Sequence, residues 1–170
     1  MPKLEYLDTN ISLNFDAPVF FDIYPAFALR SVLGRQLRVM HCVARSEQCP
    51  TCPFRKTCAY AFIFETPIEK DSGFLPGRDR ASHPFRIITD DLPGMSKNCL
   101  DFRFQLYGKG IEFLPHIIYA FREAGRDGLF RQRGKFSLSA TTLKGYPLLE
   151  GDRLLVQNAI PEQVIIAKDD

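Results

Sequence analysis

The chain has 170 residues and a formal net charge of +2, and 45% of its residues are hydrophobic and 25% charged. These values are ordinary for one soluble domain, and no apolar run approaches the roughly 20 residues of a membrane span. The polar start MPKLEYLDTN also lacks the layout of a signal peptide, so we expect a cytoplasmic protein with no membrane partner. The small net charge permits a nucleic-acid partner without requiring one.

The first part of the chain predicts a strand followed by a helix. Residues 4–15 are rich in aromatic and β-branched types and partly alternate, which predicts a strand, and residues 19–21 continue it after a break. Residues 25–40 predict a helix, because a proline suits the first turn and apolar side chains recur on one face. Arg30, Arg35 and Arg38 lie largely off that face. They are either a solvated surface or contacts to phosphates.

Residues 41–60, HCVARSEQCPTCPFRKTCAY, hold four of the five cysteines in the spacing C-x6-C-x2-C-x5-C. Two prolines favour a turn at the central pair. Four thiolates can complete a tetrahedral metal site, and a reducing compartment favours this over disulfides. The first interpretation is a structural zinc ion on Cys42, Cys49, Cys52 and Cys58. An iron–sulfur cluster is the second, redox disulfides are the third, and free thiols are the alternative to all three. Cys99 is expected in the core.

The rest of the chain predicts strands around one further helix. The cleanest alternation, over residues 100–107, predicts a strand with its even positions in the core. Extended segments are expected at 60–65 and 84–88, with a polar loop over 69–82 between them and a turn at 90–94. The remaining expected elements are a helix over 111–124, a basic loop over 129–135, a strand over 136–140, and short strands at 154–157 and 164–167.

The resulting order, βαββαβ, specifies an α+β ferredoxin-like fold with both helices on one face of the sheet. The Cys-rich segment, at about 42–58, is then an insertion after the first helix, and an extra hairpin follows at the C-terminus. The open face of such a sheet can carry ligands, as in RNA-recognition domains.

A basic loop near residue 130 is the better candidate for RNA contact. Arg126, Arg131, Arg133 and Lys135 lie among glycines and can follow a phosphate backbone, and Phe130 can stack on a base. The alternative is an exposed loop that only adds solubility.

An ordered set of motifs resembles one known family. The set comprises residues 28–38, the four cysteines, Tyr60 with Phe64 and Glu65, residues 83–85, residues 113–115, Gly128 with Leu129, and residues 133–136. Together they resemble the N-terminal half of CRISPR-associated RAMP proteins, and look closest to the endoribonuclease family that processes precursor CRISPR RNA (Cas six). The resemblance covers about residues 4–143. It implies a protein with two tandem ferredoxin-like domains that binds a repeat RNA and cuts it without a metal, using the 2′-hydroxyl beside the scissile phosphate.

This chain, residues 1–170, is long enough for a single such RAMP domain only, so the second RAMP domain is expected to be absent from it. Cleavage needs a base, an acid and a cation. His41, at the end of the first helix where family members that use histidine often place it, is the candidate acid or base. Tyr24 and Lys56 are the candidates to orient RNA or stabilise charge. The alternative for His41 is a neighbour of the metal site or a surface residue, and His83 and His116 rank below it.

Three hypotheses follow. The chain is the N-terminal domain of a precursor CRISPR-RNA endoribonuclease, a noncatalytic RNA-binding subunit of a CRISPR effector complex, or a metal-stabilised interaction module without RNA. The expected partners are CRISPR repeat RNA, other CRISPR-associated subunits, or the second RAMP domain.

Overall fold

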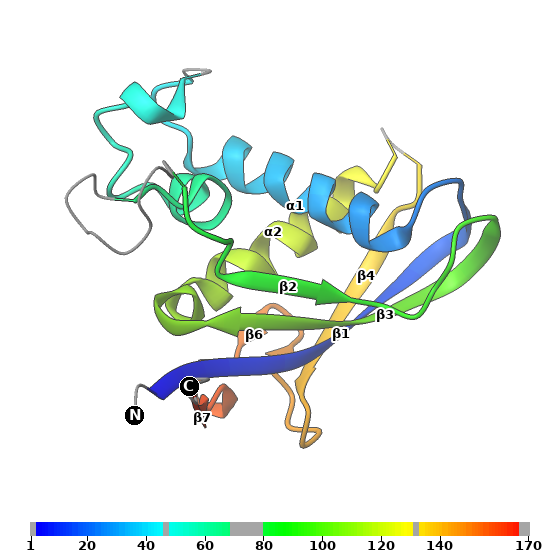
Figure 1. Cartoon of the computed structure of the whole chain (residues 1–170). Coiled ribbons are helices and arrows are strands. Elements are labelled where there is room, and N and C mark those ends of the chain that lie inside the picture. Colours follow the sequence, from blue (N-terminus) through cyan, green and yellow to red (C-terminus); the bar gives the residue numbers. More distant parts are fainter. Residues whose placement is uncertain (1–2, 46–47, 69–79, 131–132, 167–170) are drawn as a thin grey trace.

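One antiparallel sheet of five strands is the base of the fold (Figure 1). The computed structural model describes residues 3–45, 48–68, 80–130 and 133–166. β3 lies between β2 and β1, and the other edge of β1 pairs with β4 and, nearer its start, with β7. The strands are β1 (Lys3–Phe21), β2 (Phe85–Ile88), β3 (Met95–Tyr107), β4 (Phe136–Thr142) and β7 (Glu162–Ile165).

Two helices, α1 (Pro25–His41) and α2 (Leu114–Asp127), cover one side of this sheet (Figure 1). The chain therefore has an α+β fold, and the predicted order β1–α1–β2–β3–α2–β4 is confirmed. Each helix has a proline in its first turn, where the missing N–H costs no hydrogen bond. The buried Gln36 of α1 ties the two helices together, because its Nε2 donates to Asp127 Oδ2 at 2.6 Å.

The core lies between the sheet and the helices. The even residues from Leu100 to Leu106 of β3 are buried, as their alternation predicts, and each is the register partner of a buried residue of β1. Phe104 stacks on Phe85 of β2 at 5.5 Å between ring centroids and meets Phe121 of α2 edge-on at 6.0 Å. α2 also packs very closely on β4, because a Cβ on Gly125 would lie 2.3 Å from the Phe136 carbonyl oxygen.

Two predictions about local structure were wrong. Residues Ala61–Glu65, expected as a strand, form a short π-helical turn in which Ala61 and Ile63 are buried. Cys99, expected in the core, is half-buried on the opposite side of β3, and its thiol contacts Asp101 Oδ1 at 3.7 Å. The odd positions from Cys99 to Tyr107 lie on that side, so the strand's register decides the place of the thiol.

The C-terminal part is organised differently from the expectation. A small hairpin is present, but it consists of β5 (Leu149–Glu150) and β6 (Arg153–Leu154) and not of the strands expected at 154–157 and 164–167. Residues Val156–Asn158 form a 3-10 turn instead of a strand. β7 then returns to the start of β1. The expected loop over 69–82 falls largely on residues 69–79, outside the described residues.

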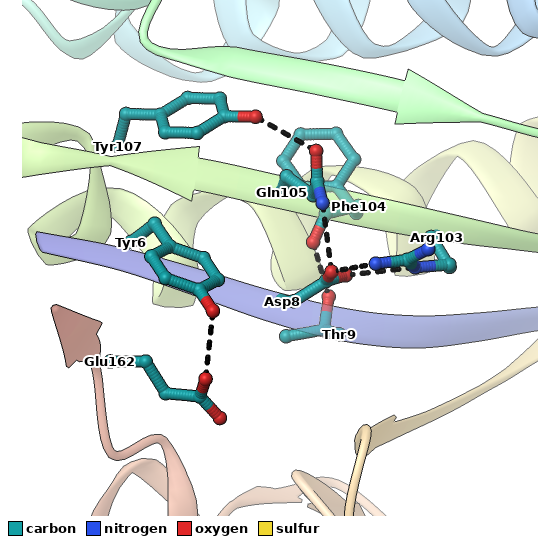
Figure 2. Close-up of polar contacts among 8 residues, drawn as sticks. All are labelled: Tyr6, Asp8, Thr9, Arg103, Phe104, Gln105, Tyr107 and Glu162. Atoms are coloured by element: carbon teal, nitrogen blue, oxygen red, sulfur yellow. Dashed lines mark hydrogen bonds and ion pairs between the residues drawn. The ribbon is translucent and has the colours of Figure 1, made fainter. Parts of the chain in front are cut away.

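The side of the sheet away from the helices carries a polar network, which Figure 2 shows around Asp8. The buried Asp8 carboxylate accepts hydrogen bonds from Arg103 and from Gln105 Nε2, the latter at 2.8 Å. The hydroxyls of Tyr6 and Tyr107 donate to Glu162 and Gln105, each at 2.8 Å. These mutually bonded side chains differ from the open aromatic rings with which RNA-recognition sheets stack bases. Within the described part of the chain, no helix is both long and apolar enough to cross a membrane.

Candidate nucleic-acid interface and histidine pocket

A groove of about 530 Å³ lies on the outer side of α1, and we call it the arginine groove. Its α1 residues mostly recur at spacings of three and four, which places them on one stripe of the helix, away from the buried stripe. Its other wall comes from the helical turn over residues 60–65. The lining residues are Phe27, Arg30, Ser31, Gly34, Arg35, Arg38, Tyr60 and Phe64.

The aromatic wall of the groove depends on a glycine. A Cβ on Gly34 would lie 3.2 Å from the Phe64 ring, so the missing side chain lets that ring rest directly on α1. Tyr60, one helical turn before Phe64, stacks on it with centroids 5.6 Å apart and ring planes at 12°. The result is a stacked pair of rings beside the guanidinium groups of the helix.

Arg30 is held in place by aromatic and imidazole groups. Its guanidinium lies 5.2 Å from the centroid of Phe64 and 5.3 Å from that of Phe85, within the range of cation–π attraction. Its Nη2 lies 2.7 Å from His83 Nε2, which must accept the hydrogen bond because arginine only donates. His83 then carries its proton on Nδ1, 3.2 Å from the Ile63 carbonyl oxygen. Burial, and next the charge of Arg30, lower the pKa of His83.

Arg35 and Arg38 complete the basic side of the groove. The Arg38 guanidinium lies 5.7 Å from the centroid of Tyr60. Arg35 is exposed, and its Nη2 makes a long contact of 3.5 Å with the Gly128 carbonyl oxygen. Within the described residues, neither Arg30 nor Arg35 forms an ion pair with a carboxylate.

The described residues of the predicted basic loop, on either side of residues 131–132, lie between α2 and β4. Gly128 has φ +87°, and a Cβ there would lie 2.3 Å from the Arg133 carbonyl oxygen, so this position requires glycine. Arg133 is exposed, whereas Arg126 forms an ion pair of 2.8 Å with Glu123. The exposed Lys135 accepts a hydrogen bond from the backbone N–H of Asp16 through its carbonyl oxygen. The remaining predicted contact, Arg131, lies outside the described residues.

The ring of Phe130 is less available for stacking than the sequence predicts. It is half-buried and meets Phe21 edge-on at 5.8 Å, as part of the margin of the core. The arginine groove, with its solvent-facing wall, is therefore the better candidate for contact with RNA.

A second candidate site, which we call the histidine pocket, lies between the end of α1, the start of α2 and the β5–β6 hairpin. The rings of His41 and His116 lie 4.9 Å apart on its wall. The pocket measures about 460 Å³, and its lining residues are Met40, His41, Pro115, His116, Ile118, Tyr119, Arg122, Leu149, Asp152 and Leu154.

Each of the two imidazoles of the histidine pocket has one ring nitrogen without a hydrogen-bond partner among the described residues. These nitrogens are His41 Nε2 and His116 Nδ1, and both are buried. Burial, and next the neighbouring His116, lower the pKa of His41. Arg122 adds a cation, which pairs with Asp152 at 3.0 Å and lies 4.9 Å from the Tyr119 ring centroid. The pocket thus gathers two proton-transfer groups and a guanidinium, the residue types that metal-free cleavage of RNA requires.

The three predicted catalytic residues do not lie together. Tyr24 precedes the first residue of α1 and His41 is its last, so the helical rise separates them by about 25 Å. Tyr24 therefore cannot act on the phosphate that His41 reaches. Lys56 is exposed in the turn between Cys52 and Cys58.

The predicted metal ligands are half-buried and form no disulfide. The expected turn is present, because Cys49–Thr51 form a 3-10 turn and the Cys52 N–H donates to the Cys49 carbonyl oxygen at 3.2 Å. Burial, and then the charge of Glu65, raise the pKa of the Cys49 thiol, to which Cys42 and Cys58 add. Cys42 and Cys58 thus lie within electrostatic reach of Cys49.

These cysteines do not form a closed metal site as they lie. Among the residues that the structure describes, no group of three or more His, Cys, Asp or Glu side chains is placed to hold a metal ion. Zinc, and an iron–sulfur cluster as its alternative, therefore stay predictions for metal analysis.

Three of these site residues were missed or ranked low by sequence reasoning. Tyr60 and Phe64 were assigned to a strand, although their spacing of four also fits one side of a helix. His116 was ranked below His41. Its pairing with His41 follows from the packing of α1 against α2, which no local sequence signal reveals.

The fold and these sites define an α+β domain with an arginine groove and a histidine pocket. The chain belongs to the AF_1859_N family, whose model is described as an N-terminal domain and matches residues 4–160. Comparison with curated proteins and with solved structures gave no match. The family description names no activity, so the function is argued from the two sites.

Proposed function

We propose that this chain is a CRISPR-associated RNA-binding domain of the ferredoxin-like RAMP type. It would be the N-terminal part of a cytoplasmic, metal-independent endoribonuclease that cuts precursor CRISPR RNA at its repeats. The observation that carries the proposal is the arginine groove, where three guanidinium groups stand beside two stacked aromatic rings. Guanidinium groups bind phosphates and aromatic rings stack on bases, so the groove suits an RNA strand.

The fixed position of Arg30 supports this proposal. A side chain already held by His83, Phe64 and Phe85 loses little further freedom when it meets a phosphate. The strand order β2–β3–β1–β4, with both helices on one side, supports the ferredoxin-like assignment.

The histidine pocket supports cleavage as the second part of the proposal. In this scheme one imidazole takes the proton of the 2′-hydroxyl, and the 2′-oxygen attacks the adjacent phosphorus. The other imidazole protonates the 5′-oxygen as its bond to phosphorus breaks, which leaves a cyclic phosphate and a 5′-hydroxyl. The imidazoles of His41 and His116 are the groups assigned to these transfers, and Arg122 is the cation assigned to the phosphate charge.

Incubating the purified chain with labelled CRISPR-repeat RNA in EDTA tests both parts. Salt-sensitive binding with cleavage, lost in His41→Ala and in His116→Ala, is the expected result. Binding without cleavage would assign the chain to the noncatalytic RNA-binding subunits. No binding at low salt would refute the RNA proposal and leave the metal-stabilised interaction module.

Two controls keep these outcomes apart. Tyr146→Ala removes an exposed aromatic ring on the turn after β4, away from both sites, and should leave binding and cleavage unchanged. Circular dichroism of each histidine variant shows whether it is folded, because both imidazoles are partly buried.

A further inference from the structure

Large apolar side chains are exposed where β1 passes into α1. Tyr24 is 51% exposed and Phe27 is 64% exposed. Neither ring is needed to start the helix, because the Phe27 N–H donates to the Tyr24 carbonyl oxygen at 2.9 Å through the backbone alone. Ile23 beside them is also exposed, and exposed large apolar side chains that gather in one place, unlike single ones, mark a surface that meets a ligand.

The two rings are ordered against each other. Their centroids lie 5.9 Å apart and their planes meet at 70°, an edge-to-face arrangement. In such a pair each ring keeps a face that is not covered by the other. A flat ligand can therefore lie on Tyr24 or Phe27 without disturbing their contact.

The charge beside this pair indicates what the ligand is. Phe27 is also a lining residue of the arginine groove, so the aromatic surface continues into a surface of guanidinium groups. The nearest acidic residue in the sequence, Asp22, lines a different hollow together with Phe20 and Arg133. A polyanion with flat apolar groups at regular intervals complements both surfaces, and single-stranded RNA has that chemistry.

We propose that Tyr24 and Phe27 form a stacking platform for unpaired bases of an RNA strand whose phosphates lie in the arginine groove. This proposal rests on the RNA-binding function proposed above and adds the form of the substrate. Bases inside a duplex are already stacked on their neighbours, so the platform selects a single-stranded segment. Tyr24 is thereby a base-contacting residue and takes no part in proton transfer at His41.

The chain contains no tryptophan, which permits a direct test. Phe27→Trp preserves a stacking ring and makes it the single indole of the chain. Titration with a short oligoadenosine should quench its fluorescence, whereas titration with a duplex RNA should not. The matched control is Tyr146→Trp, whose parent side chain is 59% exposed on the turn after β4 and should show no quenching.

Affinity measurements complete the test. Phe27→Ala and Tyr24→Ala should each weaken oligoadenosine binding roughly 5- to 100-fold, as loss of one base–aromatic stack does. The dependence of affinity on salt should stay the same, because a stack releases no counterions. Phe27→Trp keeps a stacking ring and should therefore bind oligoadenosine more tightly than Phe27→Ala.

Different results would refute the stacking platform and the RNA-binding function. If the unmodified chain binds RNA but Phe27→Ala and Tyr24→Ala bind equally well, the platform is refuted and RNA binding stands. The platform is also refuted if Phe27→Ala abolishes self-association of the chain and leaves RNA affinity unchanged, which would make this surface a protein contact. If the unmodified chain binds no RNA at low salt, both proposals are refuted.

Discussion

Replacing Arg35 by glutamine is the sharpest test of the arginine groove. Arg35 is exposed and makes one long hydrogen bond within the described residues, so the change should leave the fold intact. Each phosphate contact of a single strand contributes about 0.7 to the slope of log affinity against log salt. Three arginines predict a slope of about −2.1, and two predict about −1.4. Between 50 and 200 mM salt, the affinity should then fall roughly 20-fold for the unmodified chain and roughly 7-fold for Arg35→Gln.

Fluorescence anisotropy of a labelled single-stranded repeat RNA across this salt range measures both slopes. Arg153→Gln is the matched control, because it removes the same charge from an exposed position on β6, outside the groove. Its slope should equal that of the unmodified chain. Equal slopes for Arg35→Gln and Arg153→Gln would show that Arg35 does not contact phosphate and would refute the assignment of the groove.

Three further predictions concern pH, packing and metal. Burial and the charge of Arg30 lower the pKa of His83 in the folded chain. As the pH falls, this imidazole therefore becomes protonated in the unfolded chain before it does in the folded chain. The free energy of unfolding should then decrease as the pH falls below about 6.5. His83→Gln should remove part of that decrease in urea titrations, and an unchanged profile would contradict the linkage. Gly125→Ala should lower stability by about 2 kcal/mol and Tm by roughly 4–8 °C in calorimetry, because the new Cβ meets the Phe136 carbonyl oxygen; an unchanged Tm would contradict this packing. Metal analysis of the purified protein should find one zinc ion per chain, bound after the four cysteines move together. A protein without metal would refute the metal site, and a brown protein solution would indicate an iron–sulfur cluster.

The main framework of the fold could be predicted because local signals agree with the tertiary structure. The alternation over residues 100–107 placed the even residues of β3 in the core, where they are found. Prolines at helix starts placed the beginning of α1 correctly and that of α2 within a few residues. Residues 111–113, predicted as the start of this helix, belong instead to the 3-10 segment Gly108–Phe113 that precedes α2.

The structure of residues 60–65 could not be predicted from the local sequence. An apolar run of this length fits a buried strand or a buried helical turn equally well. Tertiary packing decides: Ile63 is fully buried, Phe62 stacks on Phe113 at 4.8 Å and Phe64 rests on Gly34. The aromatic wall of the arginine groove follows from that outcome.

The candidate sites were predictable only in part. The arginines on the outer face of α1 follow from its helical period, so one side of the groove could be anticipated. The pairing of His41 with His116 depends on how the two helices pack. Cys99 illustrates a conflict between two rules, since residue type favoured burial and strand register placed it on the other side.

The edge of β1 that faces away from β3 has a consequence for how the domain opens. β4 pairs with it along Thr9–Phe15 and β7 along Lys3–Tyr6, so the two strands use separate stretches of the same edge. All four residues of β7 are exposed and none belongs to the core. β7 can therefore detach while the buried sheet stays intact, and its amides should exchange with solvent deuterium through local opening. The amides of the buried stretch Leu100–Leu106 of β3 should exchange only when the whole domain unfolds, which would give two levels of cooperativity within one sheet.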